Sequence, residues 1–240
     1  HIRSRRQRQM CIRDRSEQHR YDSRDELDAA LTETITTQLT RGIASRGSAS
    51  LVVSGGSTPQ GLFKTLSSTE LDWEKVTVLL ADERWVPETH ADSNSAMVKS
   101  LLLQGKAAAA NWIGFGAGQE DADAELARIT EILSAMDSFD VVILGMGADS
   151  HTASLFPCSV ELPEGLSTTA PVLMTQPTTA PHRRISLSKD RLLKTELGII
   201  HLLGDSKLEV YEKATAHADD DMHPISHFAH HDQFSLWFAP

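Results

Sequence analysis

The chain has 240 residues, of which 40% are hydrophobic, and its formal net charge is −10 at pH 7. This length and apolar content suffice for a globular domain with a buried core, and no apolar run is long enough to span a bilayer. The acidic charge argues against general nucleic-acid binding. Cys11 and Cys158 form no CxxC pair, which argues against a disulfide framework and favours a reducing compartment. We therefore expect a cytoplasmic protein without nucleic-acid or membrane partners.

The first 20 residues differ from the rest because they hold seven arginines and only two acidic residues. Such a segment is typical of a nucleic-acid arm or of a transit peptide. It has no apolar face to dock, so we interpret residues 1–21 as a disordered or non-native tail. Residues 22–240 show no internal repeat and no convincing linker, and we expect them to form a single domain.

Helical and extended patterns alternate after the tail. Apolar residues at helical spacing, including Leu27, Leu31 and Leu39, predict a helix over 22–46. A short buried strand at 50–53 leads through a loop at 54–58 into a helix that begins at Pro59. The next elements are a strand at 75–81, a helix at about 93–103, an amphipathic helix within 118–136 and a buried strand within 139–147.

The C-terminal part continues the same alternation. Residues 157–181 are rich in Pro and Thr and predict a surface excursion with a short edge strand at 170–174. Residues 184–214 then predict a strand, a helix, a strand, a loop and a helix, and residues 233–239 predict a last strand. Apolar strands that alternate with helices indicate an α/β fold with a mostly parallel sheet and helices on both faces.

Ligands of such folds bind outside the carboxyl ends of the strands. The loops that follow strands are Ser54–Thr58, Asp82–Arg84, Gly145–Ser154 and Gly204–Lys207. The first belongs to "SGGSTP", in which Gly55 and Gly56 let the backbone approach a ligand. The hydroxyls of Ser57 and Thr58, with free N–H groups at the helix start, favour a phosphate. The alternative is a plain helix cap and first turn.

Three basic residues follow or begin strands. Arg84 could bind a phosphate through its two-pronged guanidinium, or it could pair internally with Asp82 or Glu83. Lys207 could supply a second positive charge or be an exposed lysine at a helix start. Arg184 lies at the start of a strand, where it could face solvent or an acidic substrate.

The stretch "FDVVILGMGADSHTASLFP", residues 139–157, ends a strand in glycines and one histidine. Ser150 breaks a GxGxxG pattern and no acidic residue ends a following strand, which argues against a nicotinamide enzyme. No GxSxG is present, so a hydrolase nucleophile elbow is absent. Asp149 could orient His151, and His151 could then act as a general base towards water. The alternative is that His151 caps a helix starting near Thr152.

Several histidines near the C-terminus raise the question of a metal site. His223 and His227 are four residues apart, but Pro224 between them argues against an ordinary helix interior. We therefore predict a solvated loop and assign no metal.

Taken together, "SGGSTP", "DERWVP", "DSN", "GMGADSHTASLFP", "RISLS" and "GDSK" resemble the motifs of the 6-phosphogluconolactonase family, in its order and spacing. The resemblance covers residues 22–240. It implies a doubly wound fold shared with sugar-phosphate isomerases. It also implies hydrolysis of 6-phospho-D-glucono-1,5-lactone to 6-phosphogluconate in the oxidative pentose phosphate pathway, without a cofactor. We expect a monomer or weak homo-oligomer.

The same resemblance assigns roles to individual residues. His151 matches the catalytic histidine of the family, and Asp149 matches the acid beside it. The phosphate-side loop and the basic positions around the substrate are matched by Gly55, Gly56, Ser57, Thr58, Arg84, Arg184 and Lys207.

The chain also departs from the family pattern. Ser150 stands where the family usually has Gly, and it would be strained if the position needs a positive φ. The segment "AHADDDMHPISHFAHHDQ", residues 216–233, is unusual. Two alternatives remain open. The first is an amino-sugar-phosphate deaminase/isomerase, although its histidine motif reads more like HIAFNEP than "HTASLFP". The second is a non-catalytic sugar-phosphate sensor.

Overall fold

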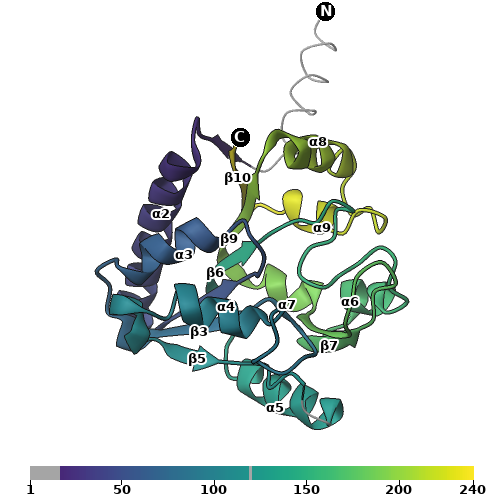
Figure 1. The fold of residues 1–240 in the computed structure, drawn as a ribbon, viewed down its shortest axis with the longest axis horizontal. Coiled ribbons are helices and arrows are strands. Elements are labelled where there is room, and N and C mark those ends of the chain that lie inside the picture. The colour runs from purple at the N-terminus through teal and green to yellow at the C-terminus, as the bar shows by residue number, and fades with distance from the viewer. Residues whose placement is uncertain (1–16, 119–120) are drawn as a thin grey trace, which may run out of the picture.

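The computed structural model describes residues 17–118 and 121–240, and Figure 1 shows their arrangement around a central sheet. The strands are β1 (Gln18–Arg20), β2 (Ala49–Val53), β3 (Val76–Leu80), β4 (Asp82–Arg84), β5 (Asn111–Ile113), β6 (Phe139–Leu144), β7 (Val172–Thr175), β8 (Arg184–Leu187), β9 (Thr195–Leu203) and β10 (Phe234–Ala239). The α-helices are α2 (Arg24–Arg46), α3 (Gln60–Ser67), α4 (Asn94–Leu101), α5 (Ala122–Ser134), α6 (Leu162–Ser167), α7 (Lys189–Leu193), α8 (Asp205–Ala214) and α9 (Ser226–Ala229). Two 3₁₀ helices, η1 (Trp73–Lys75) and η2 (Gly105–Ala109), complete the described part of the chain.

Seven of the described strands form one parallel sheet in the order β1-β10-β9-β6-β2-β3-β5. The central strands β2 and β6 are buried along their whole length, as expected of strands covered on both faces. The other three form a small antiparallel sheet in the order β4-β8-β7. The predicted α/β class with a mostly parallel sheet is confirmed.

Helices cover both faces of the large sheet. Figure 1 shows α2 and α3 on one side and α8 and α9 on the other. This arrangement follows from right-handed crossovers, because the chain runs from β2 to β3 and β5 in one direction and from β6 to β9 and β10 in the other. No helix in the described ranges combines the length and the apolar character needed to cross a membrane.

The change of direction between β2 and β6 determines where a ligand can bind. Parallel strands end at one edge, and the loops at a switch point diverge to leave a crevice. The loops after β2, β6 and β9, together with β4, which follows β3, therefore meet at that edge.

The boundary predicted between tail and domain is wrong by a few residues. Gln18–Arg20 form β1, an edge strand of the large sheet, whereas the sequence predicts a tail over residues 1–21. The strand pairs by its backbone, so its polar side chains give no sequence signal. His19 also stacks on Trp237 with ring centroids 4.1 Å apart. The rest of the predicted tail, residues 1–16, lies outside the described residues.

The solvated loop predicted around the C-terminal histidines is confirmed for residues 216–223 but is wrong for the residues that follow. Residues 224–229 are buried and include α9. Ile225 and Phe228 have no exposed surface, so their apolar side chains anchor the segment to the core. The ring nitrogens of His227 each lie 3.0 Å from a carboxylate oxygen, of Asp219 and of Asp221 respectively, which satisfies the buried imidazole.

Candidate active site

The loops at the carboxyl edge enclose a cavity of about 220 Å³. Most of the candidate residues from the sequence line it, although they come from five separate segments of the chain. The cavity is lined by Gly55, Gly56, Ser57, Thr58, Arg84, His151, Arg184 and Lys207, together with Ser54, Asp82, Asn94, Gly145, Met146, Gly147, Thr152 and Ala153. Asp149 does not line the cavity but contacts His151.

The glycine loop after β2 fits closely against its neighbours. A Cβ at Gly55 would lie 2.0 Å from Oδ1 of Asn94, so only glycine fits there without displacing that side chain. Arg24 of α2 donates a hydrogen bond to the Thr58 carbonyl at 3.0 Å and supports the loop from outside. Pro59 is the N-cap residue of α3, and no side chain caps this helix. The capping interpretation of Ser57 and Thr58 is therefore not supported.

Two arginines face each other across the small sheet. Arg84 of β4 and Arg184 of β8 are paired in register. Each is held by a carbonyl, since Arg84 Nη1 donates to Asp92 O at 2.6 Å and Arg184 Nη2 donates to Pro181 O at 3.1 Å. Like charges directly opposite on adjacent strands repel, and an anion between them relieves that repulsion.

The Arg84 guanidinium retains free hydrogen-bonding capacity. Arg84 Nε is buried and has no hydrogen-bond partner within the described part of the chain. The ion pair between Arg84 and the carboxylates of Asp82 or Glu83, considered from the sequence, is not found there either. The Glu83 carboxylate accepts from the Arg84 backbone N–H instead, at 2.8 Å.

Lys207 adds a third positive charge to the cavity. It lies in the first turn of α8, and burial lowers the pKa of its ammonium group from the ordinary value. Among the described residues the ammonium group has no ion-pair partner. A half-buried, unpaired cation gains most from a bound anion, because the anion replaces lost hydration.

His151 and Asp149 form a hydrogen-bonded pair in the loop after β6. His151 Nδ1 lies 2.5 Å from Asp149 Oδ1, and the His151 backbone N–H donates to the same oxygen at 3.2 Å. Burial alone would raise the pKa of the Asp149 carboxyl, but the hydrogen bonds and the charge of His151 outweigh burial and lower it. A carboxylate on Nδ1 favours the tautomer whose Nε2 carries a free lone pair.

The neighbours of His151 fix its ring. The ring stacks on Phe156 with centroids 3.9 Å apart and an interplanar angle of 21°. A Cβ at Gly147 would lie 2.1 Å from His151 Cε1, so a glycine is required beside the imidazole. No helix starts at Thr152, which instead forms an isolated bridge with Leu155. The interpretation of His151 as a helix cap is therefore not supported.

Ser150 has the positive φ, 64°, that was considered from the sequence. Its hydroxyl donates to the Asp149 carbonyl at 2.5 Å and lies 2.8 Å from His223 Nδ1. Because the hydroxyl has one proton, His223 is the donor in the second contact. The Ile225 N–H also donates to the Ser150 carbonyl at 3.1 Å. The two unusual parts of the sequence, Ser150 and residues 216–233, therefore contact each other.

Sequence reasoning missed several residues that shape the site. Phe156 stacks on His151 and lies 5.5 Å from the Arg184 guanidinium carbon. Asp82 accepts a hydrogen bond from the Ser154 hydroxyl at 2.5 Å, which ties the histidine loop to β4. Phe156 and Ser154 stand inside "HTASLFP", but no spacing rule indicates what either contacts.

Comparison with known proteins agrees with this geometry. The family model described as glucosamine-6-phosphate isomerases/6-phosphogluconolactonase matches residues 22–237. The chain belongs to the glucosamine-6-phosphate isomerase/6-phosphogluconolactonase family. The 6-phosphogluconolactonase of Pseudomonas putida is 38% identical over 216 residues, which is 89% of this chain and 89% of that protein.

The chain is also similar to other 6-phosphogluconolactonases over most of its length. The 6-phosphogluconolactonase of Pseudomonas aeruginosa is 41% identical over 82% of this chain and 84% of that protein. The crystal structure of a 6-phosphogluconolactonase from Shewanella baltica has a TM-score of 0.89 and 40% identity, covering 95% of this chain and 98% of that one. The doubly wound fold that the sequence resemblance implied is therefore confirmed.

Proposed function

We propose that the protein hydrolyses 6-phospho-D-glucono-1,5-lactone to 6-phosphogluconate, with His151 as the general base. The observation that carries this proposal is the placement of an oriented histidine and three cations in one cavity. The cations suit a phosphate and the histidine suits water activation. The relatives at 38% and 41% identity bear the name of this activity.

The histidine end of the cavity supplies the proton transfers. Asp149 holds Nδ1 of His151, so Nε2 takes a proton from water as the water oxygen attacks the C1 carbonyl of the lactone. The bond between C1 and the ring oxygen then breaks, and the protonated imidazole returns its proton to that oxygen. A lactone is an activated ester, so this route needs no covalent nucleophile. Backbone N–H groups of the glycine loops are suited to stabilise the oxyanion.

The basic end of the cavity positions the substrate. In this proposal Arg84, Arg184 and Lys207 bind the phosphate with the loop that contains Ser57 and Thr58. The phosphate takes no part in the bond changes, so its binding energy serves to hold C1 near His151. Substrate affinity and chemistry then depend on different residues.

The test is the hydrolysis rate of freshly prepared lactone with the spontaneous rate subtracted. We expect a large enzymatic rate, and no release of ammonia when glucosamine 6-phosphate replaces the lactone. Ammonia release without lactone hydrolysis would support the deaminase activity that the family also contains. Tight binding of the lactone without turnover would indicate a sensor.

The proposal also includes a cellular location and an oligomeric state for the enzyme. The cysteine usage of the sequence supports a cytoplasmic enzyme. We also propose that the protein acts as a monomer or weak homo-oligomer.

A further inference from the structure

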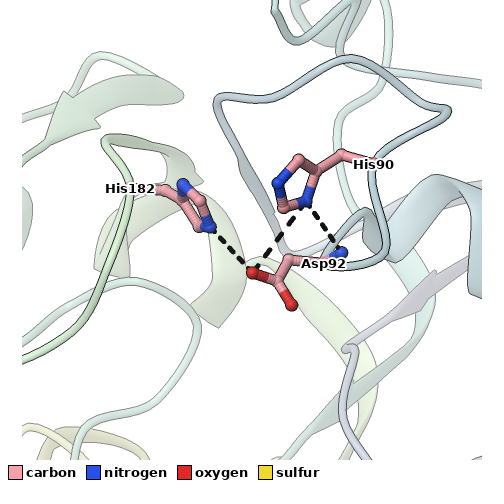
Figure 2. Close-up of side chains that lie close together, drawn as sticks. All are labelled: His90, Asp92 and His182. Carbon is pink, nitrogen blue, oxygen red and sulfur yellow. Dashed lines mark hydrogen bonds and ion pairs between the residues drawn. The ribbon is translucent and has the colours of Figure 1, made fainter.

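A second cluster of side chains lies beside the cavity, on the loops next to the two arginines. Figure 2 shows the imidazoles of His90 and His182 directed towards the carboxylate of Asp92. One potential ligand atom from each residue lies within 4.8 Å of the others. His90 and Asp92 belong to the loop after β4, and His182 belongs to the loop before β8. None of the three lines the cavity.

The geometry of the cluster brings three ligand atoms around one point. His182 Nε2 lies 2.8 Å from Asp92 Oδ2, and His90 Nδ1 lies 3.9 Å from the same oxygen. The two rings are nearly perpendicular, at 79°, with centroids 5.1 Å apart. Metal–ligand bonds of about 2.0–2.2 Å place the three ligands of one tetrahedral ion less than about 4 Å apart. His90 Nδ1 now accepts a hydrogen bond from the Asp92 backbone N–H at 3.1 Å, so an ion binds once it replaces that proton donor and the cluster closes slightly.

The loops that carry the cluster are already ordered and joined. The His90 N–H donates to the Pro87 carbonyl at 2.9 Å, and the Ser93 N–H donates to the His90 carbonyl at 3.0 Å. The Trp85 N–H donates to the Arg183 carbonyl at 2.7 Å, which links the two loops beside His182. A pre-formed set of ligands pays less ordering entropy when the ion binds.

We propose that His90, Asp92 and His182 bind a divalent transition-metal ion of the Zn²⁺ or Co²⁺ class. Two imidazole nitrogens and one carboxylate oxygen suit such ions, whereas Mg²⁺ and Ca²⁺ prefer oxygen ligands alone. The side chains of the three residues are 43%, 48% and 24% exposed, so an ion can reach them from solvent. Water fills the remaining coordination positions.

An ion bound at this cluster affects the neighbouring cavity, because the two arginines of the cavity are anchored beside the cluster. Arg84 is anchored on the carbonyl of Asp92, and Arg184 is anchored on the carbonyl of Pro181, next to His182. An ion that joins Asp92 to His182 therefore fixes the separation of the two guanidinium groups. On the proposed function, metal binding then changes KM for the phosphorylated substrate and leaves kcat nearly unchanged. Metal binding itself does not depend on that function.

The test is a titration of the metal-free full-length protein with Co²⁺, followed by visible absorption, and with Zn²⁺, followed by calorimetry. We expect wild type to bind one equivalent at this site and to show the absorption of a low-coordinate Co²⁺ ion. His90→Gln and His182→Gln should each weaken binding by more than about tenfold. His231→Gln, which removes an exposed histidine near the C-terminus, should bind like wild type. Circular dichroism confirms that each variant is folded.

Two outcomes would overturn the proposal. The first is a wild-type protein that binds neither ion. The second is binding that survives in both His90→Gln and His182→Gln, which would place the metal at other histidines. These measurements use no substrate, so they remain decisive even if the lactone is not hydrolysed.

Discussion

At the scale of single residues, the cavity combines an oriented histidine with a group of cations. His151 is held by a hydrogen bond to Asp149 and by stacking on Phe156. Arg184 contacts the same phenylalanine, so one ring positions both ends of the site. Changes at the basic end should therefore alter binding, whereas changes at the histidine should alter the chemical step.

Lys207 tests the basic end most cleanly, because its ammonium group has no ion-pair partner in the described part of the chain. Lys207→Ala should raise KM for the lactone by about 10–100-fold through loss of one charge-assisted hydrogen bond, with kcat little changed. Steady-state kinetics measures both constants. Lys213→Ala removes an exposed lysine from the same helix and should leave KM unchanged. A loss of kcat with an unchanged KM would assign Lys207 to the chemistry instead.

Ser150 tests the strained backbone beside the histidine. Ser150→Ala keeps the strain of a positive φ and removes the hydroxyl that links Asp149 and His223. Ser150→Gly loses the same hydroxyl but relieves the strain, so it should be the more stable variant by about 1 kcal/mol. Denaturant unfolding of both variants gives the difference. An alanine variant at least as stable as the glycine variant would show that the backbone at this position is not strained.

At the scale of elements, the small antiparallel sheet brings together residues that are distant in sequence. The buried carboxylate of Glu83 in β4 accepts hydrogen bonds from the backbone of Asn94 at 2.8 Å and of Ser95 at 2.7 Å. It also accepts one from the Ser93 hydroxyl at 3.2 Å. A carboxylate at a helix start is favoured by the free N–H groups and by the helix dipole. Glu83 therefore joins β4 to the start of α4.

Glu83→Gln tests this junction. The amide group of glutamine brings donors towards N–H groups that already donate, and the negative charge is lost. The free energy of unfolding should fall by about 2–4 kcal/mol. Glu88→Gln changes an exposed carboxylate that pairs with Lys99 and should cost less than about 1 kcal/mol. Equal effects of the two substitutions in denaturant unfolding would show that Glu83 does not stabilise the junction between β4 and α4.

The elements differ in how far they could be predicted from sequence. Long periodic segments such as α2 and strands with a continuous apolar run such as β6 were predicted well, because burial imposes their patterns. β4 was predicted as a loop because Asp82, Glu83 and Arg84 are polar. Its strand pairing depends on β8, about 100 residues later in the chain. β1 was missed for the same reason, since it depends on β10.

The candidate site likewise contains features that could be predicted from the sequence and features that could not. Glycine-rich loops after strands indicated where Gly55 and His151 would lie, and both line the cavity. The pairing of Arg84 with Arg184 and the stacking of His151 on Phe156 depend on the three-dimensional packing of distant segments. Neither contact has a sequence spacing that could predict it.

At the scale of the whole molecule, one buried histidine couples folding to pH. His201 in β9 is 1% exposed, and neither ring nitrogen has a hydrogen-bond partner among the described residues. Burial, with smaller contributions from the charges of Arg24 and Lys207, lowers its pKa to about 3. The folded protein therefore keeps His201 neutral, whereas the unfolded chain protonates it below about pH 6.5.

The protonation of His201 in the unfolded chain alone determines how stability changes with pH. The unfolded chain binds more protons, so the contribution of His201 to stability is fully present above about pH 6.5 and is lost as pH falls towards 3. Between pH 6.5 and 5 the loss should be about 2 kcal/mol. The measurement is the difference in unfolding free energy between wild type and His201→Gln at several pH values. A difference that does not change with pH would contradict this prediction.

The proposed mechanism depends on His151 as the general base, and replacing this side chain is the decisive experiment. Wild type and His151→Ala are assayed side by side with fresh 6-phosphogluconolactone, and the spontaneous rate is subtracted from both. Wild type should hydrolyse the lactone rapidly, and the variant, although folded, should lose about 10²–10⁴-fold in kcat. Turnover by His151→Ala at the wild-type rate would contradict this mechanism.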